Sequence, residues 1–329
     1  MKYLTPVLLA FMVSTVTAYL FLGGAEAAFA VAVLSILEVS LSLDNAVVNA
    51  KQLNLMSEVF RKRFLTWGMV VAVFGMRVAF PVLIVSVVSG INPVAALNLA
   101  LFKPAEYAAT LMSAHFSITG FGMAFLSMVF LKYFFDKEKE VHWIGFIEKH
   151  LHHLQATEVA CTAIALASVA VLLPKADALS FVMAGLVGVA SYEVVEWLSS
   201  KLGDEGGSSA VANLGWGAFI YLEVLDASFS FDGVIGAFAI TTNFLIIALG
   251  LGTGAFAVRS LTLMLVEKGT LAEFRFLESG AFYAIGALVV FMGISTFHEV
   301  PEVVTGLTGA ALIGAALISS IIWRKQNES

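Results

Sequence analysis

The chain is poor in charge, in cysteine and in the motifs of known active sites. Only 13% of its 329 residues are charged, whereas globular chains carry about 25%. The one cysteine, Cys161, excludes an intrachain disulfide and speaks against a thiolate metal site. The chain has no HExxH motif, nucleophile elbow or P-loop, so we expect that it is not an enzyme. No polar stretch is long enough for a separate soluble domain, and we expect one domain over residues 1–329.

Apolar residues make up 60% of the chain and recur in long runs. Runs of this length are typical of transmembrane helices. We therefore predict an all-α polytopic transmembrane helical bundle with about ten spans, the first of them retained rather than cleaved as a signal peptide. The predicted spans are 4–22, 27–50, 64–89, 107–135, 157–173, 178–199, 211–240, 243–266, 278–297 and 304–323. The segment 92–106, bounded by two prolines, is predicted to be a re-entrant piece or an external loop.

The distribution of Lys and Arg sets the expected orientation. If the N-terminus is cytoplasmic, nearly all basic loop residues fall on the cytoplasmic side, and Lys103 and Lys175 fall outside. Both termini are therefore expected to be cytoplasmic. Glu193 and Glu196, near the cytoplasmic end of the sixth predicted span, are expected to reach water.

The longest polar segment, 136–156, is predicted to be an amphipathic helix on the cytoplasmic leaflet. Its apolar residues at 144, 147, 151 and 154 would share one helical face. Metal sensing by the histidines at 150, 152 and 153 is the alternative for this segment.

A motif of an acid followed by alternating serines and ending in aspartate occurs twice, as EVSLSLDN from Glu38 and as DASFSFDG from Asp226. In the next span of each half a glycine precedes a buried arginine at the same spacing. The two copies lie five predicted spans apart, so they would cross the membrane in opposite directions. We therefore predict inverted half-repeats over about 27–135 and 211–323, an arrangement typical of secondary transporters.

The alternation of polar residues admits two local structures. A locally unwound segment would point all the polar side chains of each motif the same way, which is tolerated where backbone lines a cavity. A regular helix would instead form two polar stripes. These stripes would be Glu38, Ser42, Asn45 and Asn49 in the first half, and Glu223, Asp226 and Ser230 in the second.

Ionised side chains at the bilayer centre cost at least about 2.5–3.5 kcal/mol each, so buried acids must pair or bind an ion. The candidate ligands offer hard oxygen atoms, which suit Mg²⁺, Ca²⁺ and Mn²⁺. The candidate metal-binding residues are Asp44, Asp232, Glu38, Asp226, Glu223, Asn45, Ser42 and Ser230, with Arg77 and Arg259 as counter-ions. The structural alternative is a packing network in which Asp44 and Asp232 pair with Arg259 and Arg77.

The pair SLSLDNAVVNA and SFSFDGVIGAF resembles the TerC family of integral membrane proteins, especially its longer bacterial members, over about residues 27–305. That family is named for tellurium resistance, and several members are similar to manganese exporters. The resemblance carries over to Asp44, Asn45 and Asp232, with Glu38, Glu223 and Asp226 beside them. It implies a multi-pass protein of the bacterial inner membrane.

The expected function is export of divalent metal cations in exchange for protons, with Mn²⁺ as the first candidate and Ca²⁺ or Mg²⁺ open. The lipid bilayer, metal ions and protons are the expected partners, and no nucleic acid is expected. The alternative is a scaffold or sensor subunit of a tellurium- or envelope-stress resistance complex that docks proteins on the 136–156 loop.

Overall fold

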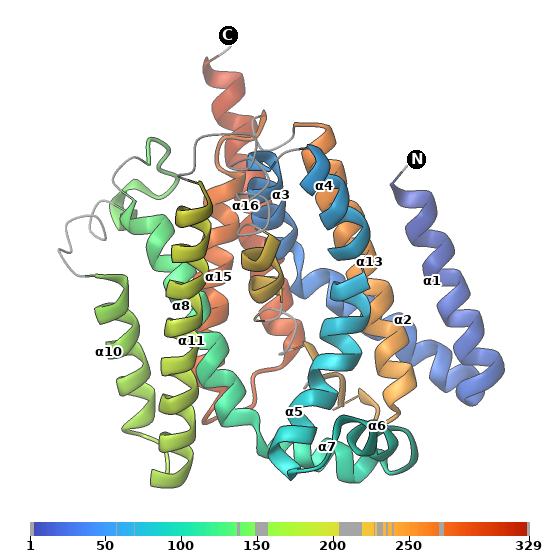
Figure 1. Ribbon diagram of the computed structural model, residues 1–329. Helices are drawn as coiled ribbons and strands as arrows, with labels where there is room; N and C mark the ends of the chain where they lie inside the picture. Colours follow the sequence, from blue (N-terminus) through green and yellow to red (C-terminus); the bar gives the residue numbers. More distant parts are fainter. Residues whose placement is uncertain are drawn as a thin grey trace.

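The computed structural model describes residues 3–327 apart from 57, 69, 137–138, 149–156, 204–218, 227, 229–232, 235, 239 and 270–272. Within these residues the chain forms helices and short connections, and none of them lies in a strand. The helices form a bundle in which the N- and C-termini lie at the same end of the molecule (Figure 1). The all-α prediction is therefore confirmed.

The described helices begin at the N-terminus with α1 (Leu4–Ala18), the π-helical segment η1 (Tyr19–Gly23), α2 (Gly24–Leu41), α3 (Leu43–Leu55) and α4 (Glu58–Arg63). They continue with the π-helical segments η2 (Phe64–Gly68) and η3 (Val71–Ala79), then α5 (Phe80–Ser89), α6 (Pro93–Phe102), α7 (Pro104–Ser113) and α8 (His115–Phe135). The second half contains α10 (Glu158–Ala170), α11 (Lys175–Gly203), α13 (Phe244–Glu267), α15 (Leu277–Ser295) and α16 (Glu302–Asn327). Residues 219–226 are also helical.

Six helices in the described part of the chain are long and apolar enough to cross a membrane. One of them is the run Leu4–Leu41, which contains a break at Gly23 and Gly24, both at positive φ. A seventh span is possible if the bent pair Arg77–Ser89 and Pro93–Phe102, which turns by 108°, counts as one. These features agree with a multi-pass membrane protein, whereas the predicted count of ten spans is not confirmed.

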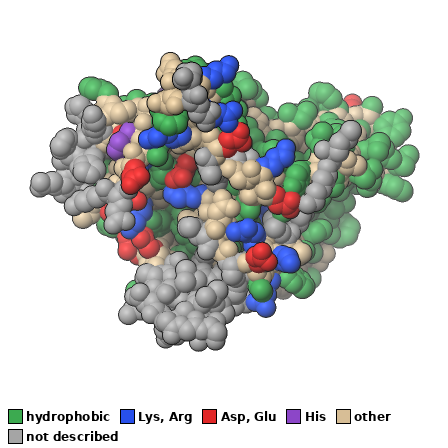
Figure 2. All heavy atoms as spheres, turned by 90° about the horizontal axis from the view of Figure 1, so that it is seen from above, with side chains coloured by type: hydrophobic (Ala, Val, Ile, Leu, Met, Phe, Trp, Pro, Cys, Tyr) green, Lys and Arg blue, Asp and Glu red, His purple; other side chains and the backbone are tan. Residues whose placement is uncertain are grey.

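Charged side chains gather at the end of the bundle that carries both termini, which we call the basic end. Figure 2, seen from above that end, shows Lys, Arg, Asp and Glu side chains spread among apolar ones. Arg61, Lys62 and Arg63 end α4 there, and Arg324 and Lys325 lie in the last turn of α16. The basic residues of α4 and α16 at this end agree with the positive-inside pattern of the sequence.

Two apolar cores divide the bundle along its length. The first contains Ala46 of α3, Val258 of α13 and Leu225 of the helical residues 219–226. It also contains residues of α8, α11 and α15. The second contains Leu34 of α2 and residues of α1, α5, α6, α7 and α13. The chain passes from one core to the other between 34 and 46, between 225 and 234, and between 251 and 258. The buried acids Glu38, Asp44 and Asp226 lie at these crossings.

Helices α8 and α11 approach closely because glycine occupies their interface. A methyl group at Gly120 would lie 2.2 Å from the carbonyl oxygen of Phe181, and one at Gly188 would lie 2.5 Å from that of Phe121. Such contacts are below van der Waals distance, so any larger side chain would force the helices apart. Glycine therefore sets the spacing of this helix pair.

The described part of the 136–156 segment is anchored to the bundle by one buried carboxylate. Glu148 accepts hydrogen bonds from Lys139 (2.7 Å), the backbone nitrogen of Ile144 (3.1 Å) and the hydroxyl of Tyr283 on α15 (3.3 Å), and His142 lies 2.8 Å away. Burial opposes the ionised carboxylate, but the hydrogen bonds from Lys139 and His142 outweigh it and lower the pKa of Glu148. Burial also lowers the pKa of the Lys139 amine, yet we take the pair as ionised because so many donors converge on Glu148.

This arrangement partly corrects the predicted amphipathic helix. Residues 139–144 lie outside any helix, and only 145–148 form a helical turn. Residues 149–156, with the three histidines at 150, 152 and 153, lie outside the described residues.

Candidate functional site

The first acidic motif lies at a break between two helices. Helix α2 ends at Leu41 and α3 begins at Leu43, with Ser42 between them at φ −107° and ψ 17°. Helical hydrogen bonds continue on both sides of this residue, from the Ser42 nitrogen to the Glu38 oxygen and from the Ala46 nitrogen to the Ser42 oxygen, each 3.1 Å long. The interruption is therefore confined to one residue, and the polar stripe of the first half, which a regular helix predicts, is largely kept.

Asp44 lies in the first turn of α3 and is buried. Its carboxylate accepts a hydrogen bond of 2.9 Å from the backbone nitrogen of Asn45. Negative charge is stabilised at a helix N-terminus, where backbone N–H groups lack helical partners. The break at Ser42 thus creates a helix start inside the bundle that can hold the Asp44 carboxylate without a basic side chain.

Three buried charges form an ion triad that joins the two halves of the chain. Arg77 of η3 forms an ion pair with Glu38 of α2, and its second guanidinium nitrogen lies 3.6 Å from Asp226. The Ser42 hydroxyl donates to Glu38 over 3.2 Å. Arg77 and Glu38 are each 2% exposed at their side chains, so the pair has almost no access to solvent. We call Glu38, Arg77 and Asp226 the ion triad.

The second acidic motif is joined to the first through Asn45, whose side-chain nitrogen donates to the Asp226 carboxylate. Glu38 is also enclosed by the second half of the chain. A methyl group at Gly254 of α13 would lie 2.4 Å from its Cβ, and one at Gly233 would lie 3.1 Å from its Oε2. Because these glycines have no side chains, α2 can closely approach α13 and the residues around Gly233 at the Glu38 carboxylate.

Arg259 of α13 lies beside the triad with a different partner. Its guanidinium donates to the carbonyl oxygen of Phe64 over 2.6 Å and lies 3.5 Å from the centre of the Phe64 ring. Gly68 makes room for it, because a methyl group there would lie 2.0 Å from the Arg259 Nη2 atom and 2.9 Å from Glu223 Oε1. Arg259 and Glu223 are therefore near neighbours around Gly68.

Several buried oxygen atoms next to the triad have no hydrogen-bond partner. They are Oδ1 of Asn45, Oδ1 of Asn49 and both carboxylate oxygens of Glu223. Each unsatisfied buried polar group costs about 1–3 kcal/mol, so such a concentration of acceptors is unusual. All four are hard oxygen donors of the kind that Mg²⁺, Ca²⁺ and Mn²⁺ take as ligands.

Acidic side chains by themselves do not form a ready metal site here. Among the described residues, no three His, Cys, Asp or Glu side chains are grouped so that they could hold a metal ion. Arg77 already occupies the space between Glu38 and Asp226. A cation bound here would therefore need amide oxygens as well as carboxylates, or a rearrangement of the triad.

Six of the eight predicted ligands and both predicted counter-ions are buried in this region, as the sequence predicted for residues inside spans. Ser230 and Asp232 lie outside the described residues. Arg77 pairs with Glu38 and Asp226. The Arg77–Asp232 pair of the structural alternative involves a residue outside the described part of the chain. Glu193 is exposed and Glu196 is half-buried, so both reach solvent as expected.

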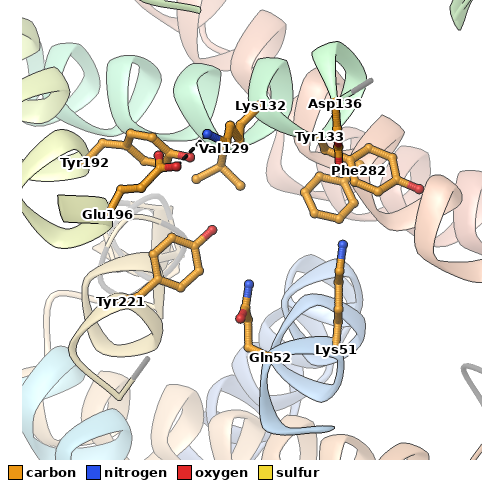
Figure 3. A pocket seen from close by; sticks show the side chains of 10 residues that line it. All are labelled: Lys51, Gln52, Val129, Lys132, Tyr133, Asp136, Tyr192, Glu196, Tyr221 and Phe282. Carbon is orange, nitrogen blue, oxygen red and sulfur yellow. Dashed lines mark ion pairs between the residues drawn. The ribbon is translucent and has the colours of Figure 1, made fainter. Parts of the chain in front are cut away.

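A cavity of about 240 Å³ lies toward the basic end, between α3, α8, α11, α15 and residues 219–226. We call it the basic-end cavity. Figure 3 shows Lys51 and Gln52 of α3 pointing into it, with Tyr221 from the opposite wall and Tyr192 and Glu196 from α11. Lys132 forms an ion pair of 2.6 Å with Glu196, and Lys51 forms one of 2.5 Å with Glu278.

The sequence analysis did not single out Gln52 and Tyr221, and it named Asn49 only as part of a stripe. The spacing of Asn45, Asn49 and Gln52 was the available signal, because residues at i, i+4 and i+7 share one face of a helix. Tyr221 carries no comparable signal, since one tyrosine in an apolar run is typical of helix packing.

Comparisons with known proteins identify the family but no activity. No curated protein and no solved structure matches the chain. One family model matches residues 43–327, which include α3, the acidic motif of the second half and α16. The chain therefore belongs to the family DUF475, which is described as proteins of unknown function.

Proposed function

We propose that the protein is a secondary transporter that exports divalent metal cations, with Mn²⁺ as the first candidate substrate and protons as the exchanged ion. The observation that carries the proposal is the ion triad together with the unpartnered oxygen atoms of Asn45, Asn49 and Glu223. The resemblance of both acidic motifs to the TerC family supports the same function. The finer expectations of ten spans, inverted half-repeats and an inner-membrane location are part of this proposal.

The energetics favour a transport role over a purely structural one. Charged side chains inside a membrane are costly and mark ion pathways more often than packing contacts. Satisfied ion pairs would be enough to hold helices together, yet Glu223 is buried with neither oxygen hydrogen-bonded. A site for a transported ion binds that ion more strongly when its acceptor atoms have no other hydrogen-bond partner before the ion arrives.

The role that we propose for each acidic residue follows from its contacts. Glu38 and Asp226 are held by Arg77 and form the fixed framework between the halves. Asp44 and Glu223 have no ion-pair partner within 4 Å among the described residues, so they are available to a cation. Asn45 contacts the framework with its nitrogen and can offer its free oxygen to the same ion. Ser42, Ser230 and Asp232 complete the proposed ligand set.

Metal content of cells tests the proposal. Cells that express the wild-type chain or the Asp44→Asn variant are grown with a series of added divalent metals, and intracellular metals are measured. The proposal expects the wild type to lower one divalent metal and the variant, at equal membrane abundance, to leave it unchanged. Wild-type export by Asp44→Asn would refute it. Loss of function on deletion of 136–156, with Asp44→Asn still active, would favour the scaffold alternative.

A further inference from the structure

Two helical segments connect the ion triad with the basic-end cavity. On α3, Asn45, Asn49 and Gln52 share one face, and Gln52 lines the cavity. Facing α3, residues 219–226 carry Asp226 of the triad and Tyr221, which lines the same cavity. Each of the two helical segments therefore has one end at the triad and the other at the cavity.

The register of the two segments places Asn49 at the level of Glu223. Asn45 donates to Asp226 at the triad, and Gln52 and Tyr221 both line the cavity (Figure 3). Along α3 the residue numbers rise from the triad to the cavity, whereas along 219–226 they rise from the cavity to the triad. The two segments therefore run antiparallel. Asn49 and Glu223 each lie between the two fixed points.

Both residues at this level have unused acceptors. Asn49 is 2% exposed and Glu223 is 9% exposed, and Oδ1 of the first and both oxygens of the second lack hydrogen bonds. The charged neighbours of Glu223 are Arg259, which shares the space around Gly68, Asp226 one turn away, and Arg77 of the triad. Three unpaired oxygen atoms with one formal negative charge are suited to a cation rather than to an anion.

The basic-end cavity can admit a hydrated cation. Its lining side chains Lys132, Glu196 and Lys51 are 54%, 37% and 34% exposed, so the cavity reaches solvent. Six waters occupy roughly 180 Å³ at about 30 Å³ each, the usual share in the liquid. That volume is smaller than the cavity of about 240 Å³. The two lysines are neutralised by Glu196 and Glu278, which reduces their repulsion of a cation.

We propose that the basic-end cavity is the entrance for a hydrated divalent cation and that Asn49 and Glu223 form the first subsite at which the cation loses water. From there the cation passes to the Asn45 oxygen and Asp44. This inference rests on the proposed transport function and adds its entrance, an additional ligand in Asn49 and the side from which the substrate comes.

Direct binding of Mn²⁺ to the purified full-length protein in detergent tests the subsite. Free Mn²⁺ is measured by electron paramagnetic resonance as protein is titrated. Asn49→Leu, which removes the amide oxygen at similar size, is expected to weaken binding about tenfold or more, as for a lost hydrogen-bonding partner of a charged group. Asn49→Asp, which keeps an oxygen at the position, is expected to bind at least as tightly as wild type. Asn54→Leu, at an exposed position of the same helix, is the matched control and should bind as wild type does.

Access is measured independently of binding in a Cys161→Ser background. Gln52→Cys should react with a membrane-impermeant thiol reagent added at the basic end, and Mn²⁺ should slow that reaction. Ser113→Cys, at the last residue of α7, which lies at the other end in Figure 1, should react only from the opposite side. If wild type binds no Mn²⁺, the proposed function itself fails. If wild type binds Mn²⁺ and Asn49→Leu binds equally well, or Mn²⁺ leaves Gln52→Cys labelling unchanged, the function stands and this inference is wrong.

Discussion

Replacing Arg77 with glutamine removes the guanidinium that bridges the two halves of the chain. Glu38 and Asp226 would then be buried acids without their shared cation. Breaking a buried ion pair by removing one partner costs about 3–5 kcal/mol, because the other charge is left uncompensated. The ion pair of Lys103 and Glu106 is the matched control, since both side chains are 62% exposed. Exposed pairs of this kind contribute about 0–1 kcal/mol.

Equilibrium unfolding of the purified protein in detergent micelles, titrated with sodium dodecyl sulfate and followed by circular dichroism, measures both costs. We expect Arg77→Gln to lower the free energy of unfolding by about 3–5 kcal/mol and Lys103→Gln by less than about 1 kcal/mol. Adding Glu38→Gln to Arg77→Gln should recover part of the loss, because it removes one stranded charge. Equal losses for Arg77→Gln and Lys103→Gln would show that the triad does not hold the bundle together.

Two further predictions concern the helix interface and the anchored loop. Gly120→Ala should destabilise the protein by about 1–3 kcal/mol in the same assay, because its methyl group would meet the carbonyl of Phe181 at 2.2 Å. Gly314→Ala, which meets nothing within 4 Å, should be neutral or stabilising, and equal effects of the two would contradict the close approach of α8 and α11. The carboxylate of Glu148 has a pKa below its ordinary value of 4.5, so its stabilisation of the loop is present above pH 4.5 and is lost as pH falls through the lower folded-state value. Pepsin should therefore cut the loop faster at low pH, once its rate is divided by its rate on an unfolded substrate at the same pH. Glu148→Gln should remove the pH dependence of this ratio, and an unchanged ratio profile in Glu148→Gln would contradict the anchor.

Helix positions could be predicted best where an N-cap residue precedes an apolar run. Asn243 accepts hydrogen bonds from the nitrogens of Leu245 and Ile246, and α13 begins one residue after the predicted start of that span. Thr157 accepts from Ala160 and starts α10 in the same way. Apolar runs carry no comparable signal for the π-helical segments η2 and η3 or for the 108° bend after Ser89, so these irregularities could not be predicted.

The burial of the candidate site could be predicted, but its pairing could not. Acidic residues inside apolar runs indicate that Glu38, Asp44 and Asp226 lie within the bundle, where they are observed. Which acid Arg77 would contact depends on how η3 packs against α2 and residues 219–226, and no local pattern contains that information. The same holds for the basic-end cavity, which is assembled from five separate parts of the chain.

Flux of Mn²⁺ into liposomes that contain the purified protein tests the central claim most directly. A trapped dye that Mn²⁺ quenches reports uptake after an outward proton gradient is imposed. The account predicts uptake by wild type and by Lys103→Gln, which alters only an exposed ion pair, and no uptake above empty liposomes by Asp44→Asn. Equal uptake by Asp44→Asn and wild type would contradict the account, as would the absence of any divalent-cation flux in the wild type.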